Sequence, residues 1–161
     1  MRGAAAALLL LAACSREATP QATPATPGLE EAAVAAGIVA DPRKASLTGL
    51  YARDTDRLCV VPQGDKWRVG VSVDFDERQG CSAAGTGTRS GERLTIVFPN
   101  CTVEAEFDGE RLFFPATLPA GCARLCTDRA TLTALEVEQL SASASEAATL
   151  RSRDGRLLCA S

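Results

Sequence analysis

The sequence predicts a small, mainly β domain built as an antiparallel meander, either a curved sheet or a partly open barrel, with short N- and C-terminal helices and three disulfides. Three observations lead to this fold class. Apolar and polar residues alternate along several short segments, turn signals separate these segments, and six cysteines lie in the second two-thirds of the chain. Alternation indicates strands with one buried face, and tight turns join strands that are neighbours in the sequence.

The clearest strand runs from Trp67 to Phe75, where every odd-numbered residue except the ends of the run is valine. The same two-residue period recurs at Leu94–Phe98 and Val103–Phe107. Turn signals flank these segments at Gly64-Asp65, Ser90-Gly91, Pro99-Asn100 and Asp108-Gly109. The strands therefore follow one another as hairpins.

Two-residue turns also predict which residues lie opposite each other. A turn at residues 108–109 places Glu106 opposite Arg111, and one at residues 99–100 places Arg93 opposite Glu106. Glu106 then lies between two arginines. These charges are interpreted as exposed cross-strand pairs, each worth about 0.2 to 1 kcal/mol, and not as a binding patch.

A short helix is expected at residues 29–41, before the sheet. The segment is rich in alanine, and Glu30 and Glu31 in its first turn suit the positive end of a helix dipole. Pro42 follows, and the residue before a proline disfavours the helical conformation. The β domain then occupies residues 42–161.

The C-terminal part is expected to add one more strand at residues 131–140 and a helix at residues 145–154. Ser143 and Glu146 have the spacing of a capping box, and Gly155 is placed to end the helix. The following leucines at 157–158 are expected to form a last strand or to dock on the core.

The six cysteines from Cys59 onward are even in number, and an even number in an exported chain predicts that all of them are paired. The register around residues 90–91 places Cys81 opposite the neighbour of Cys101, which predicts a Cys81–Cys101 disulfide. Three pairings remain for the other four cysteines, and Cys122–Cys126 with Cys59–Cys159 is the favoured one. Three residues separate the first of these pairs, a spacing that favours a structural disulfide over a redox dithiol.

Asp74, Asp76 and Glu77 form the densest acidic cluster and are the candidate surface site. On one strand, Asp74 and Asp76 would point to the same side about 6.7 Å apart, close to the separation of the two carboxylates in an inverting glycosidase. The favoured interpretation is a solvated acidic surface. Calcium binding of the EF-hand type is disfavoured, because Arg78 and Gln79 occupy positions that need a ligand and a glycine.

The composition removes several classes of site. The chain contains no histidine, which excludes a Ser-His-Asp triad, a Cys-His pair and histidine-ligated zinc. The formal net charge is −3, which gives no reason to expect a nucleic acid partner. No catalytic residue, cofactor or metal is therefore expected.

The N-terminal segment resembles that of a bacterial lipoprotein precursor. Arg2 precedes a short apolar run, and Leu11-Ala12-Ala13-Cys14 matches the lipobox of that class residue for residue. The apolar run has about half of the ~20 residues that a membrane-spanning helix needs. The resemblance implies that residues 1–13 are a signal peptide and that Cys14 becomes a lipidated N-terminus.

The resemblance also implies a location. Lipidation attaches a diacylglycerol and an acyl chain such as palmitate to Cys14, and several acyl chains together anchor a protein stably. Ser15 stands where an aspartate in this family signals inner-membrane retention, which implies the outer membrane, facing the periplasm. Residues 14–28, rich in threonine and proline, would form an extended tether of about 3.1 Å per residue.

The expected function is therefore that of a lipid-anchored, non-catalytic envelope module that binds a protein or a cell-wall component. Its general design is similar to that of small β-sheet lipoproteins, including periplasmic lysozyme inhibitors, although no inhibitor motif is present. The alternative is a small cell-wall hydrolase that uses Asp74, Asp76 or Glu77. A third possibility is a structural spacer without a ligand.

Overall fold

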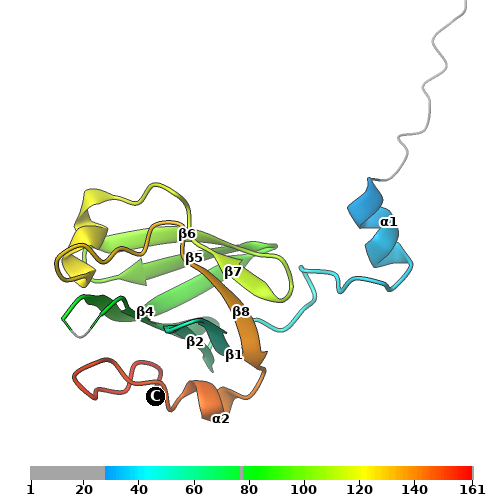
Figure 1. Cartoon of the computed structure of the whole chain (residues 1–161). Helices are drawn as coiled ribbons and strands as arrows, with labels where there is room; N and C mark the ends of the chain where they lie inside the picture. The colour runs from blue at the N-terminus through cyan, green and yellow to red at the C-terminus, as the bar shows by residue number, and fades with distance from the viewer. Residues whose placement is uncertain (1–27, 77, 161) are drawn as a thin grey trace, which may run out of the picture.

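The computed structural model of the chain describes residues 28–76 and 78–160. Eight antiparallel strands follow one another in chain order and close into a barrel, because β8 pairs with β1 (Figure 1). The predicted fold class is confirmed, and the barrel is closed. The predicted signal peptide, Cys14, nearly all of the predicted tether and Glu77 lie outside the described residues.

The elements have the following bounds. The strands are β1 (Gly49–Arg53), β2 (Asp56–Gln63), β3 (Lys66–Asp74), β4 (Gly80–Ser90), β5 (Arg93–Phe98), β6 (Cys101–Phe107), β7 (Arg111–Phe113) and β8 (Glu136–Ser141). The helices are α1 (Leu29–Ala35), the 3-10 helix η1 (Ala120–Leu125) and α2 (Ala144–Ala147). Within the part of the chain described, none of these helices has the length and apolarity needed to cross a membrane.

The barrel interior is filled by the inward-facing residues of the strands. Tyr51, Leu58, Ile96, Val103 and Phe107 are among the largest side chains that are fully buried there. The Tyr51 ring packs edge-on against Phe107 with 6.4 Å between centroids. This packing explains the alternating pattern in the sequence, since every second residue of a barrel strand points inward.

Two of the predicted hairpin turns are where the sequence placed them. Gln63 pairs with Lys66 and Phe98 pairs with Cys101, so residues 64–65 and 99–100 are the two-residue turns. The turn after β4 is shifted by one residue, to residues 91–92, because Gly91 takes the left-handed position with φ 64°. This small shift moves β5 by two residues along β4.

The turn after β6 is longer than predicted. The Asp108 Oδ1 atom accepts the backbone N–H groups of Glu110 and Arg111 at 3.0 and 2.7 Å, which stabilises a wider loop. Glu106 consequently lies opposite Phe113, and its predicted position opposite Arg111 is wrong. The other half of the register prediction, Arg93 opposite Glu106, is confirmed.

Two of the predicted disulfides are wrong. The bridges are Cys59–Cys159, as favoured, together with Cys81–Cys126 and Cys101–Cys122 in place of Cys81–Cys101 and Cys122–Cys126. The ladder between β4 and β5 ends at the pair Thr86↔Val97. The first half of β4 therefore does not pair with the end of β5, as the predicted register required. The segment containing η1 lies beside the first half of β4 instead.

The segment containing η1 covers one end of the barrel (Figure 1, yellow). Its two cysteines bind different strands, Cys122 the start of β6 and Cys126 the start of β4. Gly121 allows the close approach, since a Cβ atom there would lie 1.9 Å from the backbone oxygen of Asn100. The two disulfides thus fix this end of the barrel.

Residues 150–160, called here the C-terminal strap, lie on the outside of the barrel (Figure 1, red). Leu158 and Cys159 are buried in a second, smaller apolar cluster with Cys59 of β2 and Ala147 of α2. The Cys59–Cys159 disulfide holds the strap in place. Docking of this segment on the core was one of the two outcomes predicted for it.

The helices are shorter than expected. α1 ends at Ala35, six residues before the predicted end at residue 41. Gly37, with φ 69°, turns the chain away from the helix axis. α2 has four residues, although Ser143 is its N-cap, with Oγ accepting the N–H of Glu146 at 3.3 Å. Gly155 does not end a helix but forms a turn within the strap, where its N–H donates to Ser152 O.

The predicted strand at residues 131–140 begins later, at Glu136. The Thr131 Oγ1 atom accepts the N–H of Thr133 at 3.1 Å, and Ala134 has φ 53°. Both features bend the chain before the strand begins. Residues 131–134 belong to the segment that covers the end of the barrel.

Candidate functional site

The acidic cluster does not form the carboxylate pair that its sequence spacing suggested. Asp74 is the last residue of β3, and Asp76 lies in the following loop, so the two do not share one face of a strand. Both side chains are exposed. The prediction that they point to the same side of one strand is wrong because β3 ends between them.

The Asp76 carboxylate stabilises its own loop. Its Oδ1 accepts the backbone N–H groups of Arg78 and Gln79 at 2.8 and 2.9 Å, and its Oδ2 accepts the Gln79 side-chain amide at 2.8 Å. This arrangement is typical of aspartate in tight turns. Asp74 forms an ion pair with Arg153 of the C-terminal strap, with 3.1 Å between Oδ1 and Nε. Both carboxylates therefore have structural partners.

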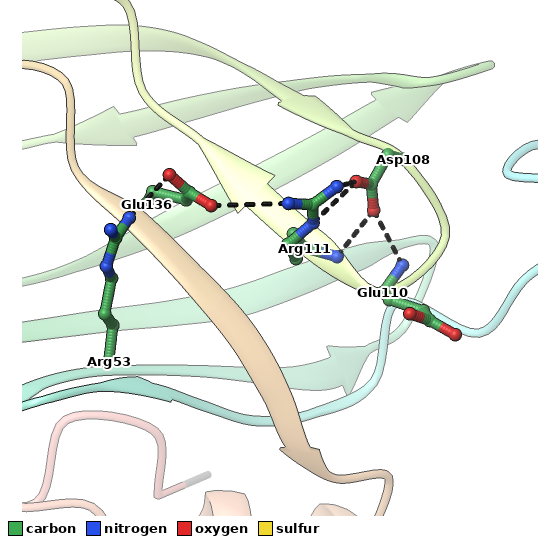
Figure 2. A network of polar contacts seen from close by, with 5 residues as sticks. All are labelled: Arg53, Asp108, Glu110, Arg111 and Glu136. Atoms are coloured by element: carbon green, nitrogen blue, oxygen red, sulfur yellow. Dashed lines mark hydrogen bonds and ion pairs between the residues drawn. The ribbon is translucent and has the colours of Figure 1, made fainter.

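A second charged cluster lies on the outside of the barrel where β8 joins β1 and β7 (Figure 2). Glu136 of β8 contacts Arg53 of β1 at 2.5 Å and Arg111 of β7 at 3.5 Å. Arg111 also contacts the Asp108 carboxylate at 2.9 Å. The two Glu136 pairs join the strands that close the barrel and the Asp108 pair is local to the β6–β7 turn; all are partly exposed, and such pairs contribute little stability individually.

Two ionisable groups have environments that shift their pKa. Burial raises the pKa of the Tyr51 hydroxyl, which donates a hydrogen bond to Leu47 O at 2.8 Å inside the barrel. Partial burial, aided by the negative charges of Asp54 and Asp74, raises the pKa of Asp56. Tyr51 is fully buried and cannot meet a ligand.

A groove lined by arginines lies beside the end of the barrel that η1 covers. It has a volume of about 410 Å³, and its described lining contains three arginines, Arg78, Arg153 and Arg156, and one acidic residue, Asp154. We call it the arginine groove. Its other lining residues are Gly80, Cys81, Ser82, Leu125 and Thr127.

Four separate parts of the chain build the arginine groove. Arg78 comes from the loop between β3 and β4, Ser82 from β4, Thr127 from the segment after η1, and the other two arginines from the C-terminal strap. Thr127 joins two of these parts. Its Oγ1 donates to Arg78 O at 3.0 Å and its N–H donates to Gly80 O at 2.9 Å.

Sequence reasoning missed this groove. The three arginines are up to 78 residues apart along the chain, and no spacing rule connects them. The only local signal is the pair of arginines that flanks the Asp154-Gly155 turn. The contact between Asp74 and Arg153 links the predicted acidic cluster to the edge of the groove, although neither Asp74 nor Asp76 lines it.

A groove of opposite character lies at the other end of the barrel. It has a volume of about 490 Å³ and is lined by four acidic residues and one arginine, together with Pro42, Ser90, Phe107 and Phe113; the charged residues are Glu30, Glu92, Glu106, Asp108 and Arg93. Residues 28–76 and 78–160 contain no group of three acidic or cysteine side chains placed to hold a metal ion.

No protein family, no curated protein and no solved structure matches this chain. The residues and their geometry are therefore the basis for the function proposed below.

Proposed function

We propose that the protein is a lipid-anchored module of the bacterial cell envelope that faces the periplasm and binds a protein or cell-wall component without catalysis. The anchor rests on the lipobox resemblance of residues 11–14. Three disulfides in a barrel of this size suit an oxidising compartment.

The observation that carries the binding role is the arginine groove. The barrel interior is packed with side chains, so a ligand meets the outer surface. On that surface, the groove combines a concave shape with a concentration of charge and with walls fixed by a disulfide. Binding sites are concave regions with a few convergent polar groups on a rigid support.

The alternative function, a carboxylate-dependent cell-wall hydrolase, has weaker support. A glycosidase needs one carboxyl group whose environment favours the protonated form, commonly by burial in an apolar pocket. Asp74 and Asp76 are exposed, and their oxygens bind Arg153 and the backbone of the β3–β4 loop. Their contacts suit a structural role.

The anchor is tested by metabolic labelling with palmitate and fractionation of cell membranes. The wild-type protein is expected to carry the label and to sediment with the outer membrane, whereas Cys14→Ala is expected to lose the label and remain unprocessed. Ser15→Asp is the matched control, because it keeps the lipidated cysteine and introduces the inner-membrane retention signal. Normal processing and unchanged membrane association of Cys14→Ala would show that the lipobox assignment is wrong.

The binding role is tested by incubating the purified lipoprotein, in neutral detergent, with cell-wall sacculi and with envelope extract. Retention without release of soluble fragments supports a binding module. Release of fragments that disappears in the Asp74→Asn, Asp76→Asn double variant would instead establish the hydrolase. If the protein is not retained and no fragments are released, the spacer function is supported and the proposal is contradicted.

A further inference from the structure

We propose that the arginine groove is a binding site for an oxyanion group, such as a phosphate group of the ligand. The inference deepens the proposed binding function and rests on it for its biological role. The site itself is argued from the charge, the hydrogen-bonding groups and the rigidity of the groove.

The charge of the groove is opposite to that of the protein. The chain has a formal net charge of −3, yet the groove contains three arginines and one aspartate among its lining residues. With Asp74, which pairs with Arg153 at the edge of the groove, the charges of these described side chains sum to one positive charge. Concave surfaces lined by one sign of charge focus the electrostatic field and concentrate ions of the opposite sign. The net positive charge favours an anion.

Arg78 and Arg156 retain donors for a ligand. Asp154 contacts Arg156 through Nε at 2.7 Å, and the terminal nitrogens of Arg156 have no hydrogen-bond acceptor among the described residues. The side chain of Arg78 has no hydrogen bond or ion pair within residues 28–76 and 78–160, and it is exposed. Arginine presents its donors as a planar fork, which fits the oxygens of phosphate or carboxylate groups.

The ion pairs of the strap position two of the guanidinium groups. Asp74 holds Arg153 through Nε at 3.1 Å, and Asp154 holds Arg156 through the same atom. Asp154 is itself held by the Ser152 hydroxyl, and hydrogen bonds from Ser152 and Arg156 lower the pKa of Asp154. Asp154 therefore remains charged and keeps the strap turn in shape.

The wall of the groove contains a hydroxyl group without a partner. The Ser82 Oγ atom is buried and has no hydrogen-bond partner in the described part of the protein. Its neighbours on β4, Cys81 and Ala83, are buried in the barrel core, so Ser82 lies on the outer side of the strand. A buried polar atom without a partner is uncommon, and rotation of the Ser82 side chain about χ1 would let its hydroxyl donate to an oxyanion in the groove.

The groove is held in shape before any ligand binds. The Cys81–Cys126 disulfide fixes β4 to the segment that contains Thr127. Thr127 bonds both Arg78 O and the backbone of Gly80, and Cys59–Cys159 fixes the strap. Binding therefore requires little ordering of the backbone, which favours affinity.

The proposal is tested by isothermal titration calorimetry of the full lipoprotein in neutral detergent, with sodium phosphate at pH 8 and low ionic strength. Saturable binding of one phosphate is expected, with acetate binding more weakly. Arg78→Gln and Arg156→Gln are each expected to weaken phosphate binding by about tenfold, the loss of one charge-assisted contact. Ser82→Ala is expected to weaken it by about threefold.

Arg93→Gln is the matched control, since it removes the same charge from the groove at the other end of the barrel. It is expected to change phosphate binding by less than about twofold at the same salt concentration. Equal weakening by Arg93→Gln and Arg78→Gln, or no saturable phosphate binding by a folded protein, would overturn the proposal. Thermal unfolding of each variant verifies that it is folded. The Arg78 side chain is exposed and has no hydrogen bond or ion pair to another described residue, so its replacement is expected to affect folding least.

The source of the phosphate group is identified by repeating the titration in two kinds of vesicle, phosphatidylcholine alone and phosphatidylcholine with phosphatidic acid. Weaker phosphate binding in the vesicles that contain phosphatidic acid supports a site whose ligand is a lipid headgroup. Equal phosphate affinity in both kinds of vesicle supports a site whose ligand is soluble. Failure of palmitate labelling would contradict the anchor and leave the phosphate result intact. Absence of phosphate binding, conversely, would not alter the sacculus assay.

Discussion

Replacement of Gly70 by alanine tests whether the C-terminal strap is packed as tightly as the structure shows. Gly70 lies on β3 beneath the strap, and a Cβ atom there would lie 2.5 Å from the Leu158 Cβ and 2.8 Å from the Cys59 Sγ. Non-bonded carbon atoms prefer about 3.5 to 4.0 Å. The strap would therefore have to move outward by about 1 Å.

The strap cannot move outward freely. Cys159 is bonded to Cys59 directly below it, and the Arg68 side chain donates a hydrogen bond to Leu158 O at 3.1 Å. Overpacking of this kind costs about 1 to 3 kcal/mol. Alanine also restricts the unfolded chain more than glycine does, which stabilises the folded state by about 0.4 to 1 kcal/mol. Gly70→Ala is therefore expected to lower the free energy of unfolding by about 1 to 2 kcal/mol.

The measurement is urea unfolding of the oxidised protein, with Gly87→Ala as the matched control. A Cβ atom at Gly87, on the neighbouring strand, would lie 3.0 Å from side-chain methyl groups of Leu94 and Val69, which yield by small rotations. Gly87→Ala is expected to lower the free energy of unfolding by much less than Gly70→Ala does. The reasoning would be refuted if the two substitutions cost the same.

A second background separates strain under the strap from a general effect of alanine on β3. When Cys59 and Cys159 are both replaced by alanine, the strap is free to retreat and one of the two clashing atoms is absent. In this background, Gly70→Ala is expected to cost less than about 0.5 kcal/mol, and the difference is the coupling energy of the cycle. An unchanged cost would show that the disulfide does not hold the strap against β3.

Three further predictions follow from single contacts. Loss of the strap disulfide, which closes 100 residues, is expected to cost about 4 to 5 kcal/mol in chemical denaturation, against about 3 kcal/mol for Cys101–Cys122, which closes 21; the reverse order would contradict the loop-closure argument. Asp76→Ala is expected to cost about 1 kcal/mol and Asp76→Asn less, because the amide oxygen retains the backbone contacts of Oδ1; equal stability of both variants and the wild type would show that the loop needs no cap. The raised pKa of Asp56 means that the folded state holds its proton to higher pH than the unfolded state, so this group destabilises the fold as the pH rises above the ordinary aspartate pKa of 3.8. Asp56→Asn should therefore be more stable than the wild type at pH 7 and equal to it at pH 3. Unfolding curves that differ equally at both pH values would exclude this cause.

The alternating pattern of β3, β5 and β6 was sufficient to predict the fold class. A strand with one buried face needs an apolar residue at every second position, and this pattern can be recognised within a short stretch of sequence. The turns at residues 64–65 and 99–100 were predictable for the same reason, since glycine and asparagine tolerate positive φ. The N-cap of α2 at Ser143 is likewise a local hydrogen bond.

Register required information that short motifs do not contain. A shift of one residue at Gly91 displaced β5 by two residues along β4, and the Asp108 side chain widened the next turn. Such small differences decide between turns that are nearly equal in energy. They also explain why Cys81 was assigned to Cys101, when each binds a cysteine of the segment around η1.

By itself, the sequence determined the class of fold, the number of disulfides, and the contacts that neighbouring residues make along strands, turns and caps. Tertiary structure alone decided the closure of β8 onto β1, the position of η1 over the barrel end, and the meeting of Arg78 with Arg153 and Arg156. The physical reason is one of range. Backbone preferences and side-chain alternation act over a few residues, whereas the groove depends on packing and disulfides that join residues far apart along the chain.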